Sequence, residues 1–427
     1  MIDVVNLKNG KVDSFIKQVK REKNYSDEFK DIVKDIINDV KLQGDKALYY
    51  YTDKFDNTKL DALYVNEKEI EEAINSVDKG FIEVLRGAKD NIEKYHKRQL
   101  KDSWFTNEEE GKVLGQLYNP IEKVGIYVPG GSAAYPSSVL MNVIPAKVAG
   151  VNEIIMATPP GKDGKVNKDI LVAAYIVGID QIIKVGGAQG IAALAFGTDT
   201  IPKVHKIVGP GNIYVATAKG MVYGDVDIDM IAGPSEILII ADESANPRYL
   251  AADMLSQAEH DNMASAKLVT TSGELVLGVK EELKNQLKLL ERGDIAEKSL
   301  GNYGKICIVD DIYDAVKIAN EIAPEHLELM VKDPFNMMYK IKNAGAIFLG
   351  QYAPEPLGDY WAGPNHVLPT GGTAKFFSPL GVDDFVKKSS IIYYDKGALY
   401  KDKDKIIEFA QREGLTAHGN SIKVRFE

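Results

Sequence analysis

Hydrophobic residues follow one spacing in the first part of the chain and another spacing beyond it. Up to about residue 96 they recur every three or four positions, which is the period of an amphipathic helix. The pattern is clearest within 29–44, where a glycine ends it, and it returns over 68–75 and 81–96. The residues before about Ser26 are polar and weakly patterned, which is typical of a terminal arm.

From Val124 onward, short apolar runs alternate with helical segments. Such alternation predicts right-handed crossovers and mostly parallel sheets that are covered by helices on both faces. The strand candidates outnumber the strands of one ordinary sheet, so we predict an α/β fold with two doubly wound, Rossmann-like sheets. The strand candidates are Val124–Val128, Glu153–Ala157, Gln181–Val185, His205–Val208, Ile237–Ala241, Lys267–Thr270, Ile306–Val309 and Ala346–Leu349. The intervening helical segments include Val139–Ala149, Ile170–Val177, Ile191–Ala195 and Ile213–Val222.

Two stretches lie outside this alternation. Residues 113–118 have the composition of a strand and precede Val124–Val128 across Asn119-Pro120, which predicts a hairpin. The alternation stops after Phe377, so the end of the chain is predicted to form a small separate unit. The predicted parts are an N-terminal arm (1–24), a large discontinuous α/β domain (25–125 and 237–380), a second α/β domain (126–236) and a C-terminal unit (381–427).

Composition narrows the class of protein. A chain of 427 residues with 45% hydrophobic residues predicts a globular protein of more than one domain. The net charge of -10 argues against non-specific nucleic-acid binding, which needs a positive surface. No apolar run has the length of a membrane span, and Met1-Ile2-Asp3 does not begin a signal peptide. The single cysteine excludes an intramolecular disulfide, so we expect a cytoplasmic protein.

Three glycine-rich turns follow strand candidates and open helices, at 129–132, 186–190 and 209–212. Glycine lets the backbone approach a ligand, and the following helix N-terminus favours negative charge. Crevices at the carboxyl ends of parallel strands bind dinucleotides in doubly wound folds. No G-x-G-x-x-G follows a strand, and each turn taken alone is equally explained by tight strand-to-helix packing. Together the three turns favour a nucleotide cofactor bound without the usual fingerprint.

A helix predicted to begin at Asn246-Pro247 carries the first candidate chemical groups. Its apolar stripe should face a core, whereas His260 lies roughly 150° from the centre of that stripe, with Gln257 on the same side. A solvated polar face explains this placement as well as a binding site does. The decision therefore depends on what the rest of the chain brings to these two residues.

Other candidate groups lie far apart in the sequence. Glu325 and His326 follow Pro324, on a loop that enters a strand, and Asp359 lies in a loop rich in glycine, proline and aromatic residues. Nitrogen and oxygen donors without cysteine suit a zinc site that stays open to a ligand, and the candidate donors of this kind are Gln257, His260, Asp359 and His418.

Cys307 lies between apolar neighbours in a predicted strand, which indicates a buried core residue. A cysteine thiohemiacetal, a common route for aldehyde oxidation, is therefore not expected in this chain.

Taken together, the motifs resemble those of the histidinol dehydrogenase family, from about Lys123 to the end of the chain. The motifs that carry the resemblance are 125–131, 185–190, 209–212, 231–236, the helix with Gln257 and His260, Pro324-Glu325-His326, Gly358-Asp359, 365–370, and Glu413 with His418. The resemblance implies a zinc-dependent oxidation of L-histidinol through L-histidinaldehyde to L-histidine with two NAD, the last steps of histidine biosynthesis.

The resemblance also implies residue roles. Gln257, His260, Asp359 and His418 would hold zinc, which anchors the imidazole and amine of the substrate. His326 would be the general base, and Glu325 would help to activate water for the second step. The implied NAD contacts are Tyr127, Gln189 and Asn212. The implied substrate contacts are Ser235 and Glu413, together with His326 and the four zinc-binding residues.

The resemblance further implies a homodimer in which the C-terminal unit is exchanged, so that Glu413 and His418 complete the partner's site. The end of the alternation near Phe377 agrees with such an arrangement.

Three other functions stay open at this point. A related dehydrogenase of another small primary alcohol, such as sulfopropanediol, would use the same fold, although Glu413 suits an imidazole better than a sulfonate. A zinc hydrolase with Glu325 as water activator would not need the glycine turns. A non-enzymatic binding protein would leave the Glu325-His326 pair without a role.

Overall fold

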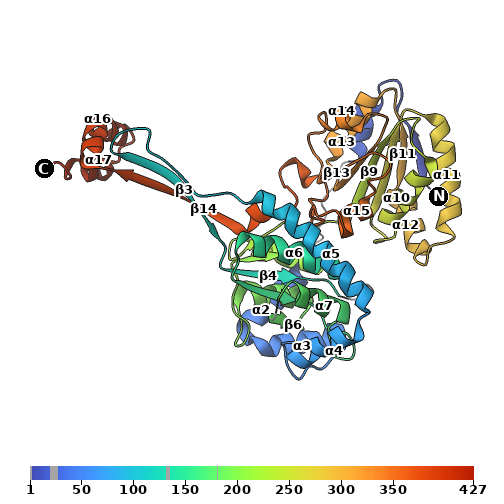
Figure 1. The fold of residues 1–427 in the computed structure, drawn as a ribbon, viewed down its shortest axis with the longest axis horizontal. Helices are drawn as coiled ribbons and strands as arrows, with labels where there is room; N and C mark the ends of the chain where they lie inside the picture. The colour runs from blue at the N-terminus through green and yellow to red at the C-terminus, as the bar shows by residue number, and fades with distance from the viewer. Residues whose placement is uncertain (1, 20–26, 131–134, 180) are drawn as a thin grey trace.

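The computed structural model describes residues 2–19, 27–130, 135–179 and 181–427. Within these residues the chain forms two parallel sheets, of six and five strands, and one antiparallel sheet of three strands. Figure 1 shows the two parallel sheets in separate bodies, with a third small body at the end of a long arm. The predicted α/β class with two doubly wound sheets is confirmed.

The larger sheet has the strand order β1-β11-β10-β9-β12-β13, and all its pairings are parallel. Every residue of β9 and β10 is buried, because helices cover both faces of the sheet. Its strands are β1 (Asp3–Asn6), β9 (Glu236–Ala241), β10 (Ser265–Thr270), β11 (Lys305–Ile308), β12 (His326–Met330) and β13 (Ala346–Leu349). Its helices are α1 (Val12–Val19), α10 (Pro247–Ala258), α11 (Gly273–Leu287), α12 (Gly293–Tyr303), α13 (Ile312–Ile322), α14 (Pro334–Met338) and α15 (Glu355–Tyr360).

The smaller sheet has the strand order β6-β5-β4-β7-β8 and is also wholly parallel. Its strands are β4 (Lys123–Tyr127), β5 (Glu153–Ala157), β6 (Gln181–Ile183), β7 (Lys206–Val208) and β8 (Asp227–Ile228). Its helices are α2 (Asp27–Gln43), α3 (Asp45–Asp56), α4 (Glu67–Ser76), α5 (Lys79–His96), α6 (Pro136–Ala149), α7 (Lys168–Ile176), α8 (Gly187–Phe196) and α9 (Ile213–Val222). Short 3-10 helices cover Lys97–Gln99, Thr373–Lys375 and Val382–Phe385.

The antiparallel sheet forms the arm that carries the C-terminal helices. Strands β3 and β14 pair along nine residues each and run side by side away from the smaller sheet (Figure 1). The elements of this region are β2 (Trp104–Thr106), β3 (Lys112–Pro120), β14 (Val386–Tyr394), α16 (Lys396–Arg412) and α17 (Thr416–Lys423). The predicted hairpin across Asn119-Pro120 is wrong, because β3 pairs with β2 and β14 while β4 joins the parallel sheet.

Core packing also differs from the predicted domain boundaries. Residues of α2 to α5 pack on the two faces of the smaller sheet, although the sequence grouped 25–125 with 237–380. Phe385 packs in the same core. Strand β1 pairs with β11, so the predicted arm at 1–24 begins as an edge strand of the larger sheet. Helical periodicity identifies the buried face of a helix but not the sheet that covers it, which explains these errors.

Residues 229–235 connect β8 of the smaller sheet directly to β9 of the larger sheet. This connection leaves the smaller sheet at the carboxyl end of β8 and enters the larger sheet at the amino end of β9. A short stretch of chain therefore joins the carboxyl edge of the smaller sheet to the amino edge of the larger sheet. Among the described residues, no helix is both long and apolar enough to cross a membrane.

Candidate active site

Helix α10 begins as predicted, since the Asn246 side chain accepts a hydrogen bond from the Arg248 backbone N–H and Pro247 occupies the first turn. Gln257, in its last turn, is completely buried. Neither Oε1 nor Nε2 of this amide has a hydrogen-bond partner within the described part of the chain. A buried amide without partners costs free energy. Gln257 is therefore not part of a solvated polar face, and its amide is available to a ligand.

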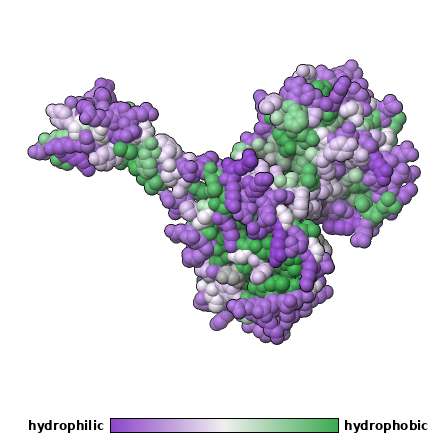
Figure 2. Space-filling view, viewed as in Figure 1, coloured by the Kyte–Doolittle hydropathy of each residue, from purple (hydrophilic) through white to green (hydrophobic). Residues whose placement is uncertain are grey.

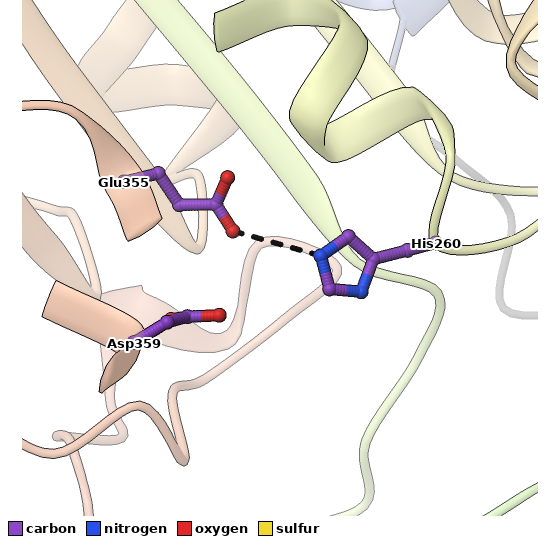
Figure 3. A group of neighbouring side chains, drawn as sticks. All are labelled: His260, Glu355 and Asp359. Carbon is purple, nitrogen blue, oxygen red and sulfur yellow. Dashed lines mark ion pairs between the residues drawn. The ribbon is translucent and has the colours of Figure 1, made fainter. Parts of the chain in front are cut away.

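His260, just past the end of α10, faces two carboxylates of α15. Figure 3 shows the imidazole pointing toward Glu355 and Asp359. The ligand atoms of the three residues lie within 4.8 Å of one another, and His260 Nε2 is 3.8 Å from a Glu355 carboxylate oxygen. Such a group of nitrogen and oxygen donors suits a divalent cation. Two of the four predicted zinc ligands, His260 and Asp359, are thus brought together with Glu355.

Sequence reasoning missed Glu355. The residue is buried, its Oε2 accepts a hydrogen bond from the Ser256 hydroxyl at 2.9 Å, and its backbone N–H donates to Glu328 Oε1 at 2.9 Å. The available signal was its spacing of four residues from Asp359, which puts both carboxylates on one face of a helix. Gly358 lets α15 lie close to β13, because a Cβ there would be 2.7 Å from the Phe348 ring.

Glu325 and His326 lie at the amino end of β12, buried beside the first residue of β9. Glu325 Oε2 accepts a hydrogen bond from the Glu236 N–H at 2.9 Å, and His326 Nδ1 lies 3.2 Å from the Glu236 carbonyl oxygen. His326 Nε2 is 3.8 Å from Asp359 Oδ1 and has no hydrogen-bond partner in the described chain. The Glu325-His326 pair therefore adjoins the metal-donor group through Asp359.

The electrostatics of this pair follow from burial and from close charges. Burial raises the pKa of Glu325 to about 8, although His326 acts in the opposite direction. Burial by itself would lower the pKa of His326, but the surrounding carboxylates, Glu325 foremost, raise it to about 10. Asp359 has its pKa raised by burial and lowered by nearby imidazoles, and the net direction is down. These imidazoles include His366, which sequence reasoning left without a role.

The predicted cofactor residues lie together at the carboxyl edge of the smaller sheet. Tyr127 ends β4, and its hydroxyl accepts a hydrogen bond from the Gly187 N–H at 3.0 Å. Gln189 lies in the first turn of α8, and its buried Oε1 has no partner among the described residues. Asn212 caps α9, where its side chain accepts from two backbone N–H groups. Tyr127, Gln189 and Asn212 thus lie at or after the carboxyl ends of β4, β6 and β7, at the edge where doubly wound folds bind ligands. Residues 131 and 132 of the predicted glycine turn at 129–132 lie outside the described residues.

Ser235 links the cofactor edge to the Glu325-His326 pair. It is the last residue of the connection from β8 and directly precedes Glu236, which contacts both members of that pair. Glu413 and His418 are not brought to the site. They are exposed in the C-terminal unit, which lies at the far end of the arm (Figure 1). Within one chain, close contacts link His260, Asp359, Glu325 and His326, and Gln257 precedes His260 at the end of α10. Tyr127, Gln189 and Asn212 form a separate group at the carboxyl edge of the smaller sheet.

A family model for histidinol dehydrogenase matches this chain over residues 19–426. The chain belongs to the histidinol dehydrogenase family. A histidinol dehydrogenase from Clostridium acetobutylicum is 61% identical over 395 residues, which cover 92% of each protein. One from Listeria innocua is 55% identical over 420 residues, which cover 98% of each. The predicted family and the predicted oxidoreductase class are confirmed, and the hydrolase and binding-protein alternatives are not supported.

A solved structure of the histidinol dehydrogenase family, from Elizabethkingia anophelis, has the same fold. It covers 99% of this chain and 98% of its own, with a TM-score of 0.95 and 39% identity. An NAD-dependent aldehyde dehydrogenase from Sinorhizobium meliloti is similar in fold alone, with a TM-score of 0.50 and 14% identity over 86% of this chain and 87% of its own.

Cys307 is buried in β11, as predicted, and burial raises the pKa of its thiol to about 12. At about pH 8 roughly one thiol in ten thousand is then ionised, so we expect iodoacetamide to leave the native protein unmodified. Mass spectrometry of the alkylated protein measures this, with guanidinium-unfolded protein as the reactive control. Rapid alkylation of the native protein would show that Cys307 is accessible and would reopen a thiol-based route.

Proposed function

We propose that this chain oxidises L-histidinol through L-histidinaldehyde to L-histidine with two NAD and a bound zinc ion. One observation carries the proposal: the ligand atoms of His260, Glu355 and Asp359 lie within 4.8 Å of one another, and the fully buried amide of Gln257, three residues before His260, has no partner in the described chain. A buried polar group of this kind calls for a ligand. The names of the relatives, which are histidinol dehydrogenases, support the choice of substrate and reaction.

We assign the zinc site to Gln257, His260 and Asp359 of one chain, with His418 as the fourth ligand. All are nitrogen or oxygen donors, which suits zinc in a site that stays open to a substrate. The buried carboxylate of Glu355, 3.8 Å from His260, adds negative charge that favours a cation there. The ion would supply a fixed charge that holds the imidazole and amine of the substrate.

We assign the general base to His326 and the activation of water to Glu325. His326 Nδ1 lies beside the Glu236 carbonyl oxygen, so Nε2 is the atom left to exchange a proton with the substrate hydroxyl. A cation held by the neighbouring carboxylates would lower the pKa of His326, and the neutral imidazole would then take the hydroxyl proton. Glu325 is held by the Glu236 N–H, in a site that excludes bulk water. Ser235, next in the chain to Glu236, and Glu413 are assigned to substrate binding. Since the only cysteine is buried in β11, the aldehyde step is assigned to attack by water.

We assign NAD to the carboxyl edge of the smaller sheet, with contacts to Tyr127, Gln189 and Asn212. The partnerless Oε1 of Gln189 and the positive end of α9 favour a polar, anionic ligand at this edge. A substrate bound beside the Glu325-His326 pair would pass a hydride from its reacting carbon to NAD at this edge, and the short connection at 229–235 supports that arrangement. The single buried cysteine is compatible with a reducing compartment, and the cytoplasm remains the proposed location.

We propose that the active form is a homodimer whose C-terminal units are exchanged. Glu413 and His418 are exposed and lie apart from the site of their own chain (Figure 1). Apolar residues are exposed on the arm, including Leu114, Ile392 and Tyr393, and Figure 2 shows such apolar surface between the arm and the C-terminal unit. Surface of this kind favours a partner chain, and exchange of a terminal unit is a low-cost route to a two-fold dimer.

Removal of the metal should abolish formation of NADH from histidinol, and added zinc should restore it. The reason is that the assigned ion would hold the imidazole and amine of the substrate, so the substrate is not positioned without it. In the His260→Ala variant, zinc affinity should fall by at least about a hundredfold. Bound zinc is measured by elemental analysis alongside NADH absorbance, and His205→Ala, at an exposed histidine, serves as the matched control. Full activity in protein free of metal would contradict the zinc assignment.

Replacement of the two members of the catalytic pair should separate the two oxidation steps. His326→Asn should slow both steps by about a hundredfold or more, because the base is lost in each. Glu325→Gln should slow aldehyde oxidation more than alcohol oxidation, because it keeps the hydrogen bond from Glu236 to an oxygen but loses the carboxylate. Separate assays with histidinol and histidinaldehyde measure the split. Equal losses in the Glu325 variant would mean that the roles are divided differently.

A hybrid dimer tests the exchange of C-terminal units. One protomer carries His260→Ala and the other His418→Ala, and each parent homodimer should be inactive. If the units are exchanged, one site of the hybrid receives both changes and the other receives neither, so about half of the wild-type activity should return. Two differently tagged His260→Ala protomers serve as the control. A purified hybrid that is no more active than its parents, although both bind NAD, would contradict the exchange.

A further inference from the structure

Lys219 and Asp229 form a buried ion pair that none of the roles above requires. Lys219 lies in α9 and is 1% exposed, and Asp229 follows β8 with its carboxylate fully buried. The two charges are in direct contact. Burial of two charges costs more than their attraction commonly returns, and apolar residues of similar volume often replace such a pair without loss of stability. Stability alone is therefore a poor explanation for the Lys219-Asp229 pair.

The pair holds both backbone polar groups of Gly209. Lys219 Nζ donates to the Gly209 carbonyl oxygen at 2.8 Å, and the Gly209 N–H donates to Asp229 Oδ2 at 2.8 Å. Asp229 Oδ1 also accepts from the Met230 N–H at 2.6 Å, at the start of the connection to β9. One ion pair therefore fixes the first residue of the glycine turn at 209–212 from both sides.

Gly209 packs closely against the backbone of Tyr127, at the end of β4. Its φ is +115°, and a Cβ there would lie 2.1 Å from the Tyr127 carbonyl oxygen, so only glycine fits. Glycine leaves this turn many alternative backbone conformations, and contacts from outside the turn have to select one. The side chains that hydrogen-bond to Gly209 within the described chain are those of Lys219 and Asp229.

We propose that Lys219 and Asp229 are positioning residues that hold the 209–212 turn, and with it Asn212, in the conformation that receives NAD. The proposal rests on the assignment of NAD to this edge of the smaller sheet. Neither side chain contacts the assigned zinc donors or the Glu325-His326 pair in the described chain. Asp229 also holds the Met230 N–H at the start of the 229–235 connection, so Lys219→Met, which leaves that residue in place, is the variant whose effect should be specific to the dinucleotide. Loss of the ion pair leaves the turn free to adopt conformations that do not bind NAD.

The test uses two variants of the ion pair and one control. Lys219→Met/Asp229→Asn removes the donor to the Gly209 carbonyl oxygen without leaving a buried charge alone, and Lys219→Met removes the same donor by a single change. The matched control is Lys206→Met/Asp227→Asn, because Lys206 is also buried and pairs with Asp227 across β7 and β8 at 2.9 Å. Zinc-loaded protein is used throughout, and thermal melting checks that each variant is folded.

We expect the Kd and the KM for NAD to rise by at least about tenfold in both Lys219 variants. The KM for histidinol, the zinc content and kcat at saturating NAD should stay within about twofold of wild type, and the control pair should leave NAD binding unchanged. Calorimetric titration with NAD and steady-state kinetics measure these quantities.

Three results would overturn the positioning role. One is wild-type affinity for NAD in the double variant, another is an equal loss of histidinol and NAD binding, and the third is the same loss in the control pair. If the wild-type protein itself does not bind NAD, the cofactor assignment fails, and the positioning role fails with it. Calorimetry on the wild-type protein distinguishes that case before any variant is compared.

Discussion

The short connection at 229–235 is the constraint on which the site depends. It joins the carboxyl end of β8 to the amino end of β9, where Glu236 contacts the Glu325-His326 pair. Doubly wound folds usually place their chemistry at carboxyl ends of strands. The proposed NAD site follows that rule in the smaller sheet, whereas the Glu325-His326 pair lies at the amino edge of the larger sheet. The proposed sites for cofactor and substrate would therefore lie on different sheets.

A second constraint is the negative charge buried beside that connection. Glu325, Glu328 and Glu355 are each at most 6% exposed, in the part of the larger sheet that also carries His260 and His326. Burial raises the pKa of all three carboxyls, which means that the protein resists ionising them in the absence of a cation. Desolvated carboxylates are stabilised by a nearby positive charge. A cation bound here would stabilise these carboxylates, so binding of the cation and folding of this region would be coupled.

Most of the fold was predictable because its strands are buried on both faces. Continuous apolar runs predicted β5 and β13 to the residue, although β13 is a partly exposed edge strand. Strand β12 is buried but escaped because His326 and Glu328 interrupt its apolar pattern. The strands β1 and β8 also escaped, since one is a partly exposed edge and the other has two residues. Pairing across long stretches of sequence, as between β3 and β14, leaves no local signal. The motifs predicted His260 and Asp359 but not Glu355, because their proximity arises only when α10 meets α15.

In the proposed dimer, the arm of β3 and β14 would make activity depend on the concentration of the protein. The C-terminal helices lie at the far end of this arm (Figure 1). With exchanged units, a dissociated subunit would keep its two parallel sheets and the proposed NAD-binding edge, yet its site would lack the partner's Glu413 and the partner's His418. Dilution would then lower turnover by mass action, while the folded fraction of each chain stayed the same. The equilibrium between free and paired subunits, rather than the stability of either sheet, would set the range of protein concentration in which the enzyme is active.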